Sequence, residues 1–201
     1  MSAMRIVRAG GHAQVPWKNG LGVSGVIATE PSGGGYDALD WQVATTGFAS
    51  EGPFSALTGL ERRFMLLEGD GVELTCERAD GQAVSTLRVD APFVVHQFSG
   101  DWKTWCRMLG GPVRVLNVIT RRGRFSSEVE VVPLDGRSVA EQKPGETLIA
   151  LVLQGRARIA GIEPGLSALD ALRLDAPEGA RVALPAEGAA GRLALVRLRP
   201  A

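Results

Sequence analysis

The feature that most constrains the fold of this chain is an internal repeat. GLERRFMLLEG (59–69) matches GETLIALVLQG (145–155), because in both segments two glycines stand ten residues apart and an apolar run leads into the second. Further on, LRVDAP (87–92) and LRLDAP (172–177) share five of six residues. The offsets are 86 and 85 residues, so we assign both matches to one duplication. A unit of about 85 residues is too long for a solenoid repeat and suits a small β-barrel or jelly roll.

Short apolar runs make up most of the chain. Its 26 glycines and 11 prolines separate segments of strand length such as WQVAT (41–45), VELTCE (72–77) and LALVRLR (193–199). In VELTCE the apolar and polar side chains alternate, as in a strand with one buried face. Only PFSALTGLERR (53–63) and GLSALDALRL (165–174) could hold a helical turn or two. We therefore predict an all-β fold.

The duplication predicts two similar barrels packed together, with the join near TRRGRFSSE (120–128). We expect an N-terminal barrel with its N-terminal segment over residues 1–125, and a C-terminal barrel over residues 126–201. A glycine-bounded hairpin followed by Asp-Ala-Pro resembles the cupin pattern. The resemblance implies a double cupin.

Composition narrows the class of partner. The 22 acidic and 22 basic residues cancel, so no general attraction to nucleic acid or to a membrane surface is expected. The first residues lack the apolar core of a signal peptide, and no later run is long enough to span a bilayer. Cys76 and Cys106 are too few for a disulfide framework, and we interpret them as buried free thiols. We expect a reduced, cytoplasmic protein.

Metal ligands of the usual cupin kind are missing from the sequence. Many cupins hold a metal with two His and a Glu before the hairpin glycine and one His after the Pro. The Glu position falls on Arg62 in the first half and on Leu148 in the second, and no His stands at the paired positions. His12 and His96 are the only histidines. A divalent site needs three or four protein ligands, so we predict no metal and no cofactor, and we interpret His96 as structural.

The N-terminal half carries a set of motifs in a fixed order. They are WKNGLG (17–22), Asp40–Trp41, GPFS (52–55), GLER (59–62), LLEG (66–69), PF (92–93), GD (100–101) and Asn117 with Arg121 and Arg122. Through this set the chain resembles the HutD/Ves family of bacterial bicupins. The resemblance covers roughly residues 5 to 122 by motif and the rest by length and by the repeat.

The resemblance implies a connection with histidine utilisation in some bacteria, and binding of a small acidic metabolite rather than an established reaction. The chain departs from the family at one place. Members usually carry Thr-x-Glu-Ile after the glycines, whereas this chain has Val26 at the Glu position, so a contact made by that Glu is absent.

Lys18 and Asn19 stand out because the chain has only three Lys and two Asn. Lys18 would bind a carboxylate as a point charge and Asn19 would orient it through its amide. The alternative is a solvated Lys18 beside a simple Asn-Gly turn.

Arg62 and Arg63 enter an alternating strand, so one should face inward and the other outward. Arg62 in the slot of the metal-binding Glu could hold an anion with its bidentate fork, or form a rim salt bridge with Glu61 or Glu68.

Two further polar residues are candidates for the site. Asp101 could orient Lys18 or bind the ligand, or serve only in a turn. Asn117 lies in an apolar strand, where a buried amide is either a structural link or a ligand contact. The four Trp are expected in the core or at the barrel mouth, SGGGY (32–36) in a surface loop, and TRRGR (120–124) in a solvated linker.

We therefore predict a metal-free bicupin that binds a small anionic metabolite, a carboxylate, through Lys18, Asn19, Arg62, Asp101 and Asn117 in its N-terminal barrel. Its role would be regulatory, in histidine or amino-acid catabolism. No catalytic residue is identifiable, so an enzyme is not favoured. Two alternatives stay open: a metal-independent enzyme acting on a small acid or sugar with Lys18 as acid or base, and a structural or protein-interaction module. We expect no nucleic-acid or membrane partner and allow for a homodimer.

Overall fold

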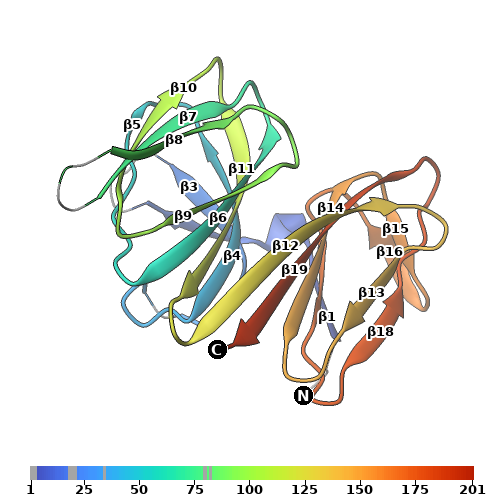
Figure 1. The fold of residues 1–201 in the computed structure, drawn as a ribbon. Helices are drawn as coiled ribbons and strands as arrows, with labels where there is room; N and C mark the ends of the chain where they lie inside the picture. The colour runs from blue at the N-terminus through green and yellow to red at the C-terminus, as the bar shows by residue number, and fades with distance from the viewer. Residues whose placement is uncertain (1–3, 18–21, 34, 79–80, 82) are drawn as a thin grey trace. The chain divides into compact units, whose positions relative to one another are not determined.

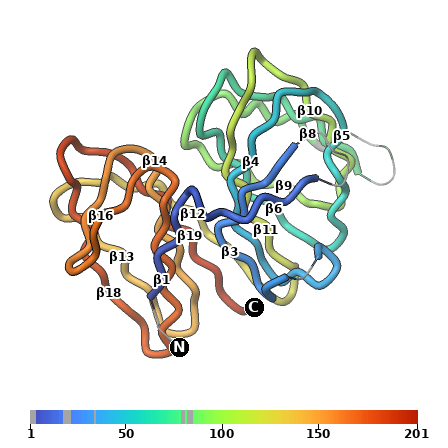
Figure 2. The backbone as a smooth tube through the Cα atoms, turned by 180° about the vertical axis from the view of Figure 1, so that it is seen from behind, coloured from blue at the N-terminus to red at the C-terminus, as the bar shows by residue number. Residues whose placement is uncertain are grey.

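The protein is built from β-strands that form two compact units. The computed structural model describes residues 4–17, 22–33, 35–78, 81 and 83–201. Apart from the 3-10 turn η1 (Ala9–Gly11), the regular elements of this part of the chain are strands, as predicted (Figures 1 and 2). One unit comprises Ala13–Arg124, and the other combines the residues up to His12 with Phe125–Ala201.

The unit Ala13–Arg124 consists of two sheets. A six-stranded sheet has the order β2-β3-β4-β11-β6-β9, and a four-stranded sheet has the order β5-β10-β7-β8. The strands are β2 (Ala13–Pro16), β3 (Val23–Glu30), β4 (Trp41–Phe48), β5 (Gly52–Pro53), β6 (Leu60–Glu68), β7 (Val72–Glu77), β8 (Ala83–Val89), β9 (Val95–Ser99), β10 (Lys103–Met108) and β11 (Val113–Arg121).

The second unit has a five-stranded sheet with the order β1-β17-β14-β19-β12 and two hairpins, β13-β18 and β15-β16. Its strands are β1 (Met4–Val7), β12 (Phe125–Leu134), β13 (Val139–Gln142), β14 (Thr147–Gln154), β15 (Ala157–Ile159), β16 (Ile162–Leu166), β17 (Ala171–Leu174), β18 (Ala180–Ala183) and β19 (Gly191–Pro200). Figure 2 shows the blue β1 among the orange and red strands of this unit. The sequence prediction placed this N-terminal segment with the first barrel instead.

The alternation seen in the sequence builds the core of the first unit. Val72, Leu74 and Cys76 of β7 are fully buried, and their polar neighbours on the strand are partly exposed. They join an apolar cluster with Phe64 and Phe98. Both cysteines are buried free thiols, as predicted, and burial raises the pKa of the Cys106 thiol to about 12.

Strand pairing shows how the duplicated units correspond. β6 and β14 hold the first sequence match, so Arg62 corresponds to Leu148. Arg62 pairs with Phe98 of β9, and Leu148 pairs with Leu174 of β17. β9 and β17 are therefore equivalent, and the double cupin fold is confirmed.

The second sequence match does not fall in equivalent strands. LRVDAP ends β8, whereas LRLDAP lies at the end of β17, which corresponds to β9. The hairpin β7-β8 is longer than its counterpart β15-β16, so the separation between equivalent positions shrinks from 86 residues at Arg62 and Leu148 to 76 at Phe98 and Leu174.

In the described part of the chain, no helix has the length and the apolar character that crossing a membrane would require.

Candidate functional site

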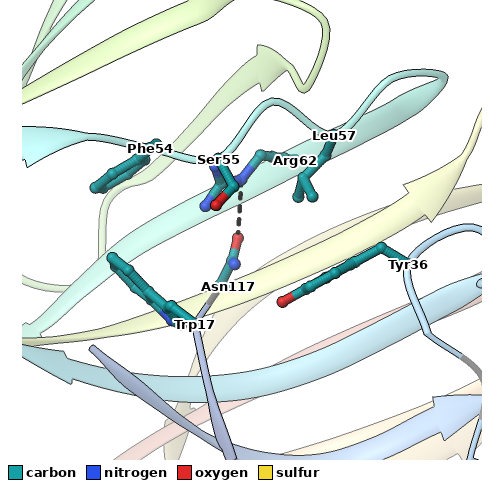
Figure 3. A pocket seen from close by; sticks show the side chains of 7 residues that line it. All are labelled: Trp17, Tyr36, Phe54, Ser55, Leu57, Arg62 and Asn117. Carbon is teal, nitrogen blue, oxygen red and sulfur yellow. Dashed lines mark hydrogen bonds between the residues drawn. The ribbon is translucent and has the colours of Figure 1, made fainter. Parts of the chain in front are cut away.

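The unit Ala13–Arg124 contains a small polar pocket with a volume of about 30 Å³. This volume is about that of one water molecule in the liquid, so the space matches a group of a few atoms. Figure 3 shows the side chains that surround it. They are Trp17, Tyr36, Phe54, Ser55, Leu57, Arg62 and Asn117.

Arg62 is the charged residue of the pocket. On β6, Arg62 is only 5% exposed, whereas the next residue, Arg63, points outward and donates to Gln97 Oε1 at 2.7 Å. The prediction that one arginine faces inward and the other outward is confirmed. Burial lowers the pKa of Arg62 to about 10, so the guanidinium still carries its charge at neutral pH.

Arg62 has two aromatic neighbours and one long hydrogen bond among the described residues. The guanidinium carbon lies 5.1 Å from the centre of the Phe54 ring and 5.0 Å from that of Phe98, which are cation–π distances. Nε donates a long hydrogen bond of 3.4 Å to Asn117 Oδ1. Among the residues that the structure describes, no carboxylate forms an ion pair with Arg62, so the rim salt bridge to Glu61 or Glu68 is not formed.

Asn117 approaches Arg62 from the neighbouring strand. It lies on β11 opposite Phe64 of β6, and its side chain is buried at 8% exposure. Its Oδ1 accepts from Arg62, which leaves the two N–H donors of the amide on the pocket side (Figure 3). The residue is thus both a structural link and a pocket wall.

Trp17 forms one wall at the end of β2. Its indole N–H donates to Ser24 Oγ at 3.0 Å, and its backbone N–H donates to the carbonyl of Gly22 at 2.9 Å. A Cβ on Gly22 would lie 3.1 Å from the indole ring, so a larger residue here would require the indole to shift by a few tenths of an ångström. Lys18 and Asn19, which follow Trp17 in the sequence, lie outside the described residues.

Tyr36 forms the opposite wall and was missed in the sequence, where SGGGY was interpreted as a surface loop. Figure 3 shows its hydroxyl directed toward the centre of the pocket. Burial raises its pKa above the ordinary value of 10, partly offset by the charge of Arg62, so the phenol keeps its proton at neutral pH. The only signal in the sequence was that this is the single tyrosine of the chain.

The loop of Tyr36 is held by an arginine from β11. Arg121 donates from Nε to the carbonyl of Leu39 at 2.7 Å, and from one terminal nitrogen to the carbonyls of Tyr36 and Asp37, each at 2.9 Å. Arg121 is therefore a positioning residue. The prediction that TRRGR is a solvated linker was wrong for this residue, because its guanidinium satisfies three backbone acceptors.

Phe54, Ser55 and Leu57 come from the loop between β5 and β6, and the first two belong to the GPFS motif of the sequence. The N–H of Phe54 donates to the carbonyl of Thr104, and the N–H of Leu57 donates to the carbonyl of Gly100, both at 2.8 Å. The Ser55 hydroxyl has no hydrogen-bond partner among the described residues and lines the pocket.

Asp101 supports this loop and is not among the residues that line the pocket. Its carboxylate accepts from the N–H of Gly59 at 2.7 Å and pairs with Arg122, which also contacts Glu61. The hydrogen bond from Gly59, followed by the contacts with Arg122, lowers the pKa of Asp101. Of the five predicted site residues, the structure thus brings together Arg62 and Asn117.

Metal coordination is not supported by the arrangement of ligand side chains. His12 and His96 belong to different units. His96 lies on β9, pairs with Phe64 of β6 and does not line the pocket. Within the described ranges, no three His, Cys, Asp or Glu side chains cluster in a way that could hold a metal ion.

The second unit has leucines where the pocket has its polar pair. Leu148 corresponds to Arg62 through the sequence repeat, which also makes Ala150 equivalent to Phe64. Asn117 pairs with Phe64 and Leu195 pairs with Ala150, so Leu195 corresponds to Asn117. Both leucines belong to the apolar core of their unit. Equivalent strands of the two units thus surround a pocket with polar side chains in one unit and apolar core residues in the other.

Comparison of sequences relates the chain to a bacterial family. A family model described as HutD matches residues 9–192. An uncharacterised 21.2 kDa protein in the hutC 3′ region of Pseudomonas putida is 34% identical over 130 residues, 65% of each chain. Protein Ves of Citrobacter koseri is 32% identical over 116 residues, 57% of this chain and 56% of Ves. The aligned parts span less than two thirds of either relative.

Solved structures share the fold over almost the whole chain. A conserved protein of unknown function from Pseudomonas aeruginosa PAO1 is 27% identical, with a TM-score of 0.81 over 98% of both chains. HutD from Pseudomonas fluorescens SBW25, determined in a formate condition, is 24% identical, with a TM-score of 0.79 over 98% of this chain and 99% of that one.

Proposed function

The chain belongs to the HutD family of bicupins, and on this premise we propose that it binds the carboxylate group of a small metabolite in the pocket around Arg62. The observation that carries the proposal is a buried, protonated guanidinium for which the described residues offer no carboxylate. An uncompensated buried charge is costly, by several kcal/mol in typical cases. A bound anion would provide the missing counter-charge.

The geometry favours a planar anion. Phe54 and Phe98 contact the guanidinium with aromatic rings, and the hydrogen bond to Asn117 uses Nε, so among the described residues the terminal N–H donors remain for a bidentate contact with a carboxylate. The amide of Asn117 and the hydroxyls of Ser55 and Tyr36 surround the same space. The contribution of Lys18 and Asn19 remains a prediction from the sequence.

The biological context is also part of the proposal. HutD from P. fluorescens was determined in a formate condition, and another relative lies in a hutC 3′ region. Both names support a role in histidine utilisation, and we place the ligand among the small acids of amino-acid catabolism, with a regulatory output.

The direct test is the shift in unfolding on addition of formate or acetate at millimolar concentration. A fivefold excess over Kd should stabilise the wild-type protein by about 1 kcal/mol. Arg62→Met should abolish the shift because the anion loses its cation. Arg63→Met is the matched control, since Arg63 is adjacent on β6 and faces outward. Equal shifts in both variants, or none in the wild type with any small carboxylate, would refute the proposal.

A further inference from the structure

A second pocket lies beside the first one in the unit Ala13–Arg124. Its volume is about 330 Å³, on the order of ten water molecules. Its lining residues are Ala13, Val15, Val26, Thr29, Gly33, Gly35, Tyr36, Leu39 and Gln42. None of these residues is charged. Tyr36 is the one lining residue that the two pockets have in common.

Strand register places both pockets on one face of the six-stranded sheet. Asn117 of β11 pairs with Ala44 of β4, which pairs with Val26 of β3, which in turn pairs with Ala13 of β2. Directly paired residues point to the same side of a sheet. Asn117 in the first pocket and Val26 in the second are therefore two strand spacings apart, about 10 Å. The small side chain of Ala44 lies between them.

Tyr36 is the residue shared by the two spaces, and Figure 3 shows its ring at the first one. Its backbone is fixed through the carbonyl that Arg121 binds, and its half-buried side chain projects into the first pocket (Figure 3), while the residue also lines the second. Rotation of a side chain between staggered positions leaves the backbone in place. A movement of the Tyr36 ring would therefore leave the loop backbone in place.

We propose that the two pockets are compartments of one ligand cleft, with the Tyr36 ring as the partition. The ligand is then a monocarboxylate with an elongated, uncharged tail: its acid group lies at Arg62 and its tail in the compartment around Val26. This inference rests on the proposed function, because it assumes that the acid group binds at Arg62.

The lining of the second compartment defines the tail. Val15, Val26 and Leu39 offer apolar surface, so burial of methylene groups there is favourable. A second carboxylate would meet no cation among the described lining residues, and its desolvation would be uncompensated. The site should therefore discriminate against dicarboxylates of the same length.

Calorimetric titration of the intact protein with acetate, butanoate, hexanoate and adipate tests the inference. Each buried methylene adds at most roughly fourfold in affinity. Hexanoate has a longer tail than acetate by several methylenes, so even partial burial of that tail should make it bind about tenfold more tightly, and adipate should lose that gain. Equal affinity for acetate and hexanoate, or binding of adipate as tight as that of hexanoate, would overturn the two-compartment cleft while leaving carboxylate binding intact. No binding of any of the four acids would instead refute the proposed function.

Two variants locate the tail. Val26→Phe fills the second compartment and should reduce hexanoate to the affinity of acetate, which itself stays unchanged. Val23→Phe is the matched control on the same strand, because Val23 is 44% exposed and does not line the compartment. If Val26→Phe does not fold, Ala13→Phe obstructs the same space from an exposed edge-strand position opposite Val26. Full chain-length dependence in a folded blocking variant would overturn the inference.

Discussion

Arg62 combines burial and charge in a way that does not favour folding. An arginine at 5% exposure loses most of its hydration, and the lowered pKa of about 10 reflects that loss. Cation–π contacts with two aromatic rings and one long hydrogen bond to Asn117 offset part of the free energy that the guanidinium loses with its hydration. The equivalent position in the other unit is Leu148, an ordinary core residue. The residue is therefore better explained by binding than by stability.

This reasoning predicts that Arg62→Met stabilises the ligand-free protein. Removing an unpaired buried charge should raise the free energy of unfolding by about 1–3 kcal/mol. All four tryptophans lie in the unit Ala13–Arg124, so urea unfolding followed by Trp fluorescence reports on it. A variant less stable than the wild type would mean that the contacts with Phe54 and Phe98 outweigh the desolvation of the charge.

The sequence identified Arg62 and Asn117 because each breaks a local pattern: a cation in the slot of a metal ligand, and an amide in an apolar strand. Tyr36 breaks no pattern in SGGGY. Its placement depends on Arg121, 85 residues away, and contacts over such separations leave no local trace. Asp101 was a candidate because of its place in the sequence, after Ser-Gly and before WKTW, but its carboxylate accepts from the Gly59 N–H and pairs with Arg122.

At the scale of elements, the loop between β3 and β4 is held by a side chain rather than by strand pairing. Arg121 satisfies the carbonyls of Tyr36, Asp37 and Leu39 with one guanidinium, a fork that lysine cannot reproduce. Arg124, in the same basic run, makes a single ion pair with Asp40 and is 63% exposed. Two arginines of one short motif are therefore expected to contribute differently to stability.

We predict that Arg121→Leu lowers the free energy of unfolding by about 2–4 kcal/mol, since it leaves several carbonyls without a charged donor. Arg124→Leu should change it by less than about 1 kcal/mol, as exposed ion pairs do. Trp fluorescence in urea measures both variants. Similar losses in the two would show that the arginines act through net charge and not through the loop.

Strand alternation was sufficient to predict the elements, since residues such as Val72 and Leu74 mark a buried face whatever the partner strand is. Pairing was harder to predict. The LRVDAP and LRLDAP matches suggested one register, yet they lie in strands that are not equivalent, because a hairpin of different length intervenes. Similarly, β1 pairs with β17, and only the three-dimensional register reveals that partner.

At the scale of the whole molecule, the duplicated fold carries different polar features in its two units. The second unit has its own buried carboxylate, Glu146, with a side chain 2% exposed between Arg197 and Arg199. Burial alone would raise the pKa of Glu146, but hydrogen bonds from the Lys143 N–H and from Arg199, with the charge of Arg197, bring it below the ordinary 4.5. Here the cations and the acid are both supplied by the chain, unlike at Arg62.

The lowered pKa of Glu146 determines how the stability of the folded state changes with pH. A carboxyl with a lowered pKa in the folded state contributes stability above about pH 4.5, and the contribution is lost as pH falls through the folded value. Glu146→Gln should therefore cost roughly 3 kcal/mol at pH 7, and this difference from the wild type should shrink as pH is lowered from 5 to 3.

Urea unfolding followed by far-UV circular dichroism at pH 7, 5, 4 and 3 measures this effect. Glu128→Gln is the matched control, because Glu128 also pairs with Arg199 but is 57% exposed. A difference between Glu146→Gln and the wild type that stays constant down to pH 3 would contradict the assignment.

The pKa of Arg62 determines how binding of an acid at this site would depend on pH. With a pKa of about 10, the guanidinium does not titrate at any pH that a bacterium tolerates internally. Most carboxylic acids are fully ionised over the same range. If an acid binds there, its occupancy follows its concentration and carries no information about acidity. The occupancy of such a site would therefore change with the supply of the acid and not with the internal pH.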